Sequence, residues 1–223
     1  RPPRTDTTLQ LRGDYGPFND MVLRSRQARD LFLIVGPPGT GKTSYGMLLT
    51  LQEELQSSNS RVLLAAYTNR AVDEACSKLL EAHIPFLRIG SAEGCDAACR
   101  PYLMDEQLRG VDADAARRRL LATRVVAGTV SALARRDSLF ALLRFSLAIV
   151  DEASQILEPQ LLPLLSAMHG TESAIARMVM IGDPRQLPAV VQQPARASAV
   201  DDTLLQGIGL HDCRASLFER LLR

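Results

Sequence analysis

Residues 36–43 read GPPGTGKT and stand between an apolar run, LFLIV at residues 31–35, and a helical pattern, KTSYGMLLTLQEEL at residues 42–55. The spacing Gly-x4-Gly-Lys-Thr is typical of a phosphate-binding loop, and a strand before and a helix after are the context that such a loop requires. Its glycines let the backbone curl until N–H groups face phosphate oxygens, and the dipole of the following helix favours the anion. The stretch therefore predicts an α/β fold with a nucleoside-triphosphate site. The competing interpretation is an incidental glycine-rich turn.

The residues of this loop have different expected roles. Lys42 is expected to reach the β and γ phosphates and to act in catalysis, and the Thr43 hydroxyl is expected to bind Mg²⁺. The other candidate nucleotide-binding residues surround them: Gly36, Pro37, Pro38, Gly39, Thr40 and Gly41.

Two later strings complete a hydrolytic site. DEASQ at residues 151–155 follows the apolar run SLAIV, and GDPRQLPAV at residues 182–190 follows another apolar run. Asp151, at the end of a strand, can hold Mg²⁺, and the adjacent Glu152 can polarise the attacking water. Gln186 is placed to sense the γ-phosphate by hydrogen bonding. Each string alone could be an ordinary turn, but together with the upstream loop they predict hydrolysis of the triphosphate.

Apolar runs of strand length recur along the chain and alternate with helical patterns. Near-continuous apolar runs fit strands that are buried on both faces of a parallel sheet. The alternation predicts a doubly wound, mostly parallel sheet with helices on both faces. The predicted strands are Leu31–Val35, Val62–Tyr67, Arg124–Ala127, Leu147–Val150 and Met178–Ile181.

Helix boundaries are predicted from capping residues. Asn69 is a plausible N-cap for the helix that follows the second strand. Pro159 could open a later helix that Gly170 closes. Ser216 and Glu219 form the S-x-x-E pattern of a capping box for the last helix.

The chain has 223 residues, enough for one large α/β domain, so residues 1–223 are predicted to form a single domain. Residues 1–17 are expected to be a lead-in, residues 91–123 an insertion, and residues 192–203 a mobile surface loop. The absence of an initiator Met suggests a piece of a longer protein. No apolar run approaches the ~18 residues that span a bilayer, so no membrane is expected as a partner.

Net charge and cysteine content add little to the functional prediction. The net charge of +1 gives no global basic field that would indicate nucleic acid. The segment from Arg100 to Arg144 has an excess of arginine, which a solvated helix face explains about as well as a phosphate-binding surface.

Cys95 and Cys99 form C-x3-C, but no second pair completes a zinc site. Free thiols in a reducing cytoplasm fit better, so a cytoplasmic location is expected.

Taken together, these strings resemble the superfamily-one helicases, in the branch of the nonsense-mediated-decay RNA helicase and the Okazaki-fragment helicase-nuclease. The resemblance runs from about Phe18 to Arg223 and implies the first RecA-like domain of an ATP-dependent helicase that uses ATP and Mg²⁺. It rests on six motifs in family order: GPPGTGKT at 36–43, TNRAVD at 68–73, GT at 128–129, DEASQ at 151–155, GDPRQLPAV at 182–190 and SLFERL at 216–221.

The resemblance also implies contacts with single-stranded nucleic acid, DNA slightly favoured over RNA, and movement from 5′ to 3′. In the family, the motifs at Thr68 and Asn69 and at Gly128 and Thr129 touch the nucleic-acid backbone. Asn69 and Thr129 follow predicted strands, so both should lie on the edge of the sheet that carries the phosphate loop. The residues alone favour a helix cap at Asn69 and a simple turn at Gly128. Trp is absent and aromatics are scarce, so extensive base stacking is not expected.

Some catalytic residues of the family have no counterpart among these motifs. The arginines that stabilise the γ-phosphate in the family belong to a second RecA-like domain, which is the expected partner within the same parent chain. Such an arginine is worth roughly 10³–10⁵ in rate, so the isolated chain is expected to be nearly inactive. The family's adenine-reading Gln is not assigned to either Gln10 or Gln27 by the stretch FNDMVLRSRQ, so adenine specificity is implied by the resemblance alone. Two alternatives stay open: an ATPase that remodels protein or ribonucleoprotein without unwinding, and a nucleotide-gated binding module.

Overall fold

The computed structural model contains one central sheet of six parallel strands in the order β1-β8-β5-β2-β4-β3. It describes residues 4–37, 41–186, 191 and 193–222, with residues 42–44 described by their backbone. The strands are β1 (Leu31–Val35), β2 (Val62–Ala66), β3 (Leu87–Ile89), β4 (Val125–Thr129), β5 (Leu147–Asp151) and β8 (Met178–Gly182). The predicted parallel α/β architecture is therefore confirmed.

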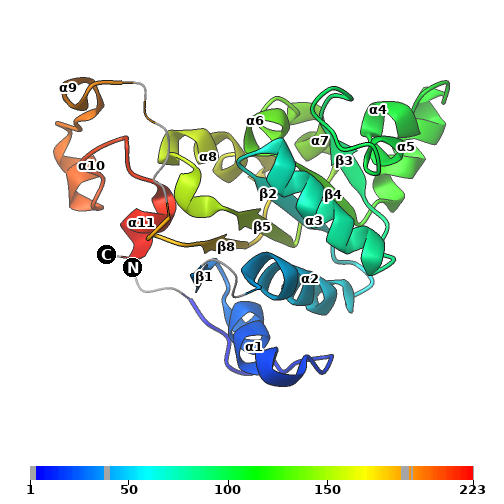
Figure 1. Ribbon diagram of the computed structural model, residues 1–223, viewed down its shortest axis with the longest axis horizontal. Coiled ribbons are helices and arrows are strands. Elements are labelled where there is room, and N and C mark those ends of the chain that lie inside the picture. The colour runs from blue at the N-terminus through cyan, green and yellow to red at the C-terminus, as the bar shows by residue number, and fades with distance from the viewer. Residues whose placement is uncertain (1–3, 38–40, 187–190, 192, 223) are drawn as a thin grey trace.

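Helices cover both faces of this sheet (Figure 1), with α2 and α3 on one side and α6 and α8 on the other. No helix among the described residues is long and apolar enough to cross a membrane. The helical elements are η1 (Gly16–Phe18), α1 (Asn19–Gln27), η2 (Lys42–Met47), α2 (Leu48–Leu55), α3 (Asn69–Glu81), η3 (Arg100–Tyr102), α4 (Met104–Gln107), α5 (Ala113–Ala122), α6 (Val130–Leu133), α7 (Asp137–Leu142), η4 (Ala153–Gln155), α8 (Glu158–Leu165), α9 (Ala195–Ser198), α10 (Thr203–Gly207) and α11 (Leu217–Leu222). A two-stranded hairpin, β6 (Met168–His169) and β7 (Glu172–Ser173), follows α8.

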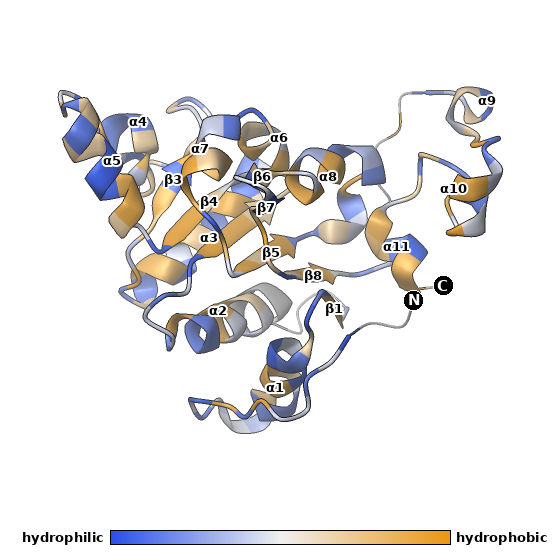
Figure 2. Ribbon diagram, turned by 180° about the vertical axis from the view of Figure 1, so that it is seen from behind, coloured by the Kyte–Doolittle hydropathy of each residue, from blue (hydrophilic) through white to orange (hydrophobic). Residues whose placement is uncertain are grey.

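The core is divided by the sheet into two clusters. In β2, Leu63 and Ala65 belong to one cluster while Val62 and Leu64 belong to the other, because successive side chains of a strand point to opposite faces. Every residue of β2, β4, β5 and β8 is buried. Figure 2 shows these strands as the hydrophobic centre of the molecule. This two-sided burial is what the near-continuous apolar runs predicted.

The strand predictions need several corrections. The second strand ends at Ala66 rather than Tyr67, and the third predicted strand runs from Val125 to Thr129 rather than from Arg124 to Ala127. The last two predicted strands each extend one residue further, to Asp151 and to Gly182. Strand β3 was not predicted at all, because Arg88 stands in the middle of its three residues.

Capping predictions were partly right. The N-cap of α3 is Thr68 rather than Asn69, because Thr68 has extended backbone and its Oγ1 accepts a hydrogen bond from the Ala71 amide at 3.1 Å. The capping box before α11 is confirmed: the amide of Glu219 donates to Ser216 Oγ at 3.1 Å, and the Ser216 amide donates to Glu219 Oε2 at 3.3 Å.

Two predictions about loops were wrong. Helix α8 ends at Leu165, and Gly170 instead forms the turn between β6 and β7 with φ of +62°. The predicted mobile surface loop at residues 192–203 is wrong in its described part, residues 193–203, which contains α9 and the buried Ser198; residue 192 lies outside the described residues. Residues 91–123 contain η3, α4 and α5, and their being an insertion stays a prediction.

The lead-in before α1 is fixed to the helix that follows the phosphate loop. Glu53 of α2 is 2% exposed and accepts hydrogen bonds from the amides of Arg12 and Gly13 and from Tyr15 Oη. Arg26 of α1 adds an ion pair at 2.9 Å. A buried carboxylate that is satisfied in this way holds the N-terminal segment against α2.

Three of the four cysteines are expected to resist thiol reagents in the native chain. Cys76, Cys95 and Cys99 are buried free thiols, and burial raises the pKa of each, that of Cys99 to about 11. Only Cys213 is partly exposed. Titration with Ellman's reagent should therefore show one fast thiol before unfolding and all four afterwards. Cys213→Ser is the control, and rapid reaction of that variant would contradict the prediction.

Candidate functional site

Three adjacent strand ends define the candidate site. Strand β8 lies between β1 and β5, and Val35 pairs with Gly182 in the register. Because all three strands are parallel, the segments that follow them emerge at one edge of the sheet. The structure therefore brings together the loop that starts at Gly36, the acidic pair at Asp151 and the loop that starts at Asp183.

The phosphate loop enters its helix through a left-handed residue. Gly41 has φ of +75°, a conformation that glycine adopts without strain, and η2 begins at Lys42. Gly36 and Pro37 follow β1 directly, as predicted. The candidate residues Pro38, Gly39 and Thr40 lie outside the described residues, as do the side chains of Lys42 and Thr43.

An aromatic pair that the sequence did not indicate lies beside this loop. The rings of Phe18 and Tyr45 stack with centroids 4.7 Å apart and planes 13° apart. A Cβ on Gly41 would lie 2.4 Å from the Tyr45 ring, so glycine is required there for space as well as for backbone conformation. Tyr45 is 49% exposed, so part of its ring faces solvent next to the loop.

The acidic pair has an unusual backbone. Glu152 is in the left-handed region at φ 52° and ψ 34°, and its amide donates to Oδ1 of the buried Asp151 at 2.9 Å. A non-glycine residue held in that region costs free energy and is found most often at functional sites. The conformation turns the chain sharply at the end of β5.

The carboxyl group of Glu152 has an unusual environment. Its Oε2 is buried without a hydrogen-bond partner among the described residues. Burial raises the pKa of Glu152, the charges of Asp151 and Glu74 raise it further, and Arg70 opposes them. A carboxyl group with a raised pKa and an unused buried oxygen is suited to accept a proton from water.

The loop after β8 is organised by Asp183. This buried side chain accepts a hydrogen bond from the amide of Arg185 at 2.9 Å, and its carbonyl accepts from the amide of Gln186 at 3.2 Å. Gln186 is half-buried and Arg185 is exposed. The rest of this motif, residues 187–190, lies outside the described residues.

Gly182, the first residue of that motif, has no room for a side chain. A Cβ there would lie 3.1 Å from the fully buried Phe218 ring and 3.1 Å from the Ser154 amide. We expect Gly182→Ala to lower the free energy of unfolding by about 1–3 kcal/mol. Gly207→Ala is the matched control, because nothing lies within 4 Å of its Cβ in α10. Urea unfolding checks both, and equal stability of the two variants would contradict this packing argument.

The candidate nucleic-acid residues end two other strands at the same edge. Thr129 Oγ1 accepts from the Ala132 amide at 3.1 Å and so caps α6, just as Thr68 caps α3. Gly128 lies inside β4 rather than in a turn, where a Cβ would come within 3.1 Å of Ile89. Thr68 and Thr129 therefore act as helix caps, and all four residues lie close to the edge of the sheet that carries the phosphate loop.

A buried arginine missed by sequence reasoning connects these segments. Arg88 in β3 is fully buried, and its Nε donates to Asp73 Oδ1 at 2.7 Å. Its Nη2 donates to Asn69 Oδ1 at 3.1 Å, and Asp73 Oδ2 accepts from the Asp96 amide at 3.0 Å. The arrangement fixes Asn69 against β3 and the segment that follows it. No local pattern pairs Arg88 with a carboxylate fifteen residues before it.

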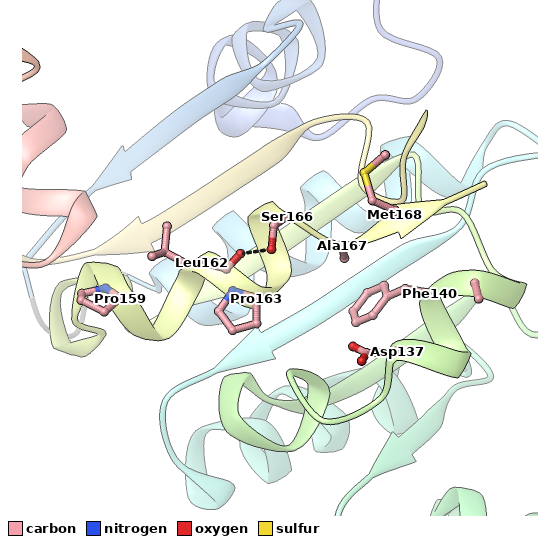
Figure 3. Close-up of a pocket in the computed structure, with 9 residues that line it drawn as sticks. Asp137, Phe140, Pro159, Leu162, Pro163, Ser166, Ala167 and Met168 are labelled. Carbon is pink, nitrogen blue, oxygen red and sulfur yellow. Dashed lines mark hydrogen bonds between the residues drawn. The ribbon is translucent and has the colours of Figure 1, made fainter. Parts of the chain in front are cut away.

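A hollow between α7 and α8 contains none of the candidate site residues (Figure 3). Its volume is about 660 Å³, with Phe140 of α7 and Pro159 and Pro163 of α8 in its walls. Ser166 Oγ donates to the Leu162 carbonyl along its rim at 2.8 Å. It carries no charged pair suited to catalysis and does not belong to the triphosphate site.

Comparison of the sequence with known proteins finds helicases among the relatives of this chain. The chain is 32% identical over 200 residues to the DNA replication ATP-dependent helicase/nuclease DNA2 of Xenopus laevis, covering 88% of this chain and 18% of that protein. It is 36% identical to the helicase/nuclease JHS1 of Arabidopsis thaliana, covering 77% and 12%, and 26% identical to the ATP-dependent helicase upf1 of Schizosaccharomyces pombe, covering 90% and 24%. The chain thus spans a small part of the length of these relatives.

The fold has solved counterparts. The UvsW helicase of bacteriophage T4 superposes with a TM-score of 0.53 at 14% identity, covering 92% of this chain and 36% of that one. The fold is of the RecA-like class, and the relatives place the chain among the P-loop NTPases found in helicases. A family model described as an AAA domain matches residues 19–114 and 100–194, and the chain belongs to that family, as a homologue of superfamily-one helicases.

Proposed function

We propose that this chain is the first motor domain of a helicase that couples ATP hydrolysis to movement along single-stranded nucleic acid. The observation that carries the proposal is Glu152 next to Asp151: its backbone is left-handed, and its Oε2 is buried with no hydrogen-bond partner among the described residues. Strained backbone clusters at functional sites, and a buried polar atom without a partner is rare in a structural role. Both are expected of a group that activates water beside a triphosphate.

Each candidate residue has one role in this proposal. Lys42 pairs with the β and γ phosphates, and the loop surrounds them with the backbone N–H groups of its non-proline residues, since Pro37 and Pro38 have none to donate. Glu152 orients the attacking water and accepts its proton. Gln186 forms a hydrogen bond that depends on the γ-phosphate, and so couples the nucleotide state to the loop after β8.

The oxygen donors of the site fit a magnesium ion. Asp151 supplies a carboxylate at the end of β5, and Thr43 supplies a hydroxyl at the start of η2; such hard oxygen ligands suit Mg²⁺. The ion would neutralise charge on the phosphates during hydrolysis. Asp151 would hold it, while its Oδ1 keeps the Glu152 amide in place.

A second RecA-like domain would complete the site. The relatives are several times longer than the segment that this chain matches, which leaves room for such a domain. We propose that it closes on ATP, supplies the missing arginines and opens after hydrolysis, so that the strand advances by steps. The chain alone is then expected to bind ATP weakly and to turn it over slowly.

The test is ATP turnover by the natural polypeptide that contains this chain, with and without single-stranded DNA and RNA. Lys42→Ala serves as the blank. Stimulation by one polymer, together with separation of a labelled duplex, is the expected result. Stimulation without strand separation would replace the helicase with a remodelling ATPase, and turnover indifferent to both polymers would exclude a nucleic-acid motor.

A further inference from the structure

Helix α10 presents an apolar surface to solvent. Leu204, Leu205 and Ile208 are 81%, 41% and 59% exposed, and we call these three side chains the α10 patch. Leu204 and Ile208 are four positions apart, so they lie on one side of the helix. Figure 1 shows α9 and α10 to one side of the sheet, beyond α8 and α11. Single exposed leucines are ordinary, whereas neighbouring ones on a projecting element mark an interaction site.

The segment that carries the α10 patch is closed at its base by backbone hydrogen bonds. The amide of Val200 donates to the carbonyl of His211 at 3.1 Å, and the amide of Cys213 donates to the carbonyl of Ser198 at 2.9 Å. Ser198 is buried, so this base is anchored in the folded domain. Helix α10 is therefore the tip of an ordered excursion from the sheet.

Two side chains fix α10 further. Asp202 caps the helix, because its Oδ1 accepts hydrogen bonds from two amides of the first turn, at 2.8 and 3.0 Å. Arg220 of α11 donates to the carbonyl of Ile208 at 2.7 Å and forms an ion pair with Glu158 of α8 at 2.5 Å. An apolar surface that is held in place in this way loses little conformational entropy when a partner covers it.

The α10 patch is too small to hold a freely diffusing partner. Stable interfaces bury about 1,200–2,000 Å² in total, and three aliphatic side chains on a helix of five residues supply only a fraction of that area. Two copies of this chain that met at the patch would have the same shortfall. A small contact suffices when its partner belongs to the same polypeptide, because the link raises the effective concentration to about the millimolar range. The relatives are several times longer than the segment that this chain matches, so such a partner has room.

The charges around the α10 patch define the surface that it would meet. Residues 198–213 contain three aspartates, Asp201, Asp202 and Asp212, and neither lysine nor arginine. Asp212 is paired with Arg214 at 2.5 Å, so the negative charge at the patch comes from Asp201 and Asp202, which precede the helix. A complementary surface is an apolar groove with lysine or arginine at its rim.

We propose that the α10 patch is a docking site for the second RecA-like domain of the same polypeptide, which meets it with an apolar groove that has a basic rim. The inference rests on the proposed function, because that function supplies the second domain. In the chain, α10 lies between the loop that carries Gln186 and α11. None of the three side chains of the patch belongs to the triphosphate site, so this contact is separate from the nucleotide.

The test is photo-crosslinking in the natural polypeptide, with benzoylphenylalanine in place of Leu204. The expected product is a single polypeptide in which residue 204 is joined to an aliphatic segment of the second domain, identified by mass spectrometry. Leu162 is the matched control position, because it is also an exposed leucine but lines the hollow between α7 and α8, and the photolabel there is expected to give no such bond.

A second variant tests the apolar character of the contact. With the photolabel in place of Ile208, the substitution Leu204→Glu is expected to lower the yield of the cross-link about tenfold, because a charge replaces a leucine that docking buries. Binding of a fluorescent ATP analogue shows that each variant is folded, since α10 lies outside the triphosphate site. An unchanged yield from Leu204→Glu would show that the patch is not buried and would overturn the inference.

The remaining outcomes separate this inference from the proposed function. A bond between two copies of the polypeptide, a bond to a different part of it, or equal yields from positions 204 and 162 would each overturn the inference. If nucleic acid stimulates ATP turnover by the unlabelled protein and position 204 forms no bond to the second domain, the inference is wrong while the proposed function stands. If turnover is indifferent to both polymers, the proposed function fails, and a bond from position 204 to the second domain still supports docking.

Discussion

Replacing Glu152 with Gln is expected to slow ATP turnover by about 10²–10⁴-fold while ATP still binds. The amide keeps the shape of the side chain but cannot accept a proton from water. Lys42 and the phosphate loop, which would supply most of the affinity for ATP, are unchanged. Turnover and equilibrium binding of a fluorescent ATP analogue should both be measured in the natural polypeptide that contains this chain.

The same substitution should not destabilise the fold. Burial and the charge of Asp151 both disfavour the ionised form of Glu152, so a neutral side chain at this position is tolerated at least as well. The thermal midpoint of Glu152→Gln is therefore expected to equal or exceed that of wild type. This separates loss of catalysis from loss of structure, and it is the behaviour expected where function is maintained at the expense of stability.

Glu81→Gln is a suitable control for this prediction. Glu81 ends α3, its side chain is 65% exposed, and among the residues that the structure describes it forms an ion pair with Lys78 alone. Its substitution removes the same charge far from the strand ends and should leave turnover unchanged. Normal turnover by Glu152→Gln would remove this residue from the mechanism, and loss of ATP binding together with turnover would assign it to nucleotide binding instead.

Asp73→Ala is expected to lower the free energy of unfolding by about 3–5 kcal/mol. The substitution leaves Arg88 fully buried without the carboxylate that it meets at 2.7 Å. It also removes the acceptor for the Asp96 amide. The large cost comes from the unpaired buried charge and not from the ion pair as such, since desolvation offsets much of the attraction in a buried pair.

A double-mutant cycle in urea tests this explanation. Arg88→Met combined with Asp73→Leu removes both charges and fills the space with apolar atoms, so it should be much more stable than Asp73→Ala alone. If Asp73→Ala costs less than about 1 kcal/mol, Arg88 has another source of stabilisation and the network described here is incomplete. If the double variant is as unstable as the single one, the pair itself is required for packing.

The candidate site was predicted from sequence because its parts obey local rules. The glycine spacing at residues 36–43 and the acidic pair at Asp151 each follow an apolar run, and the ends of parallel strands necessarily share one edge. The capping box at Ser216 depends only on residues three positions apart. Such signals are complete within a few residues, so no knowledge of the fold was needed to find them.

The errors arose where local signals were ambiguous. Thr68 and Asn69 are both good capping residues, and only the backbone conformation at Thr68 decides between them. Gly170 can end a helix or form a hairpin turn, and the pairing of β6 with β7 selects the turn. In each case two local solutions of similar energy exist, and tertiary contacts choose one.

By itself the sequence determined a parallel α/β sheet with a triphosphate loop and an acidic pair at one edge, because periodicity and motif spacing are properties of short segments. Only the tertiary structure decided that β8 lies between β1 and β5, that Arg88 is buried in a strand, and that Asp73 meets it. The last of these joins residues that no local pattern pairs. Their energies depend on burial and on charges that only the folded arrangement brings together.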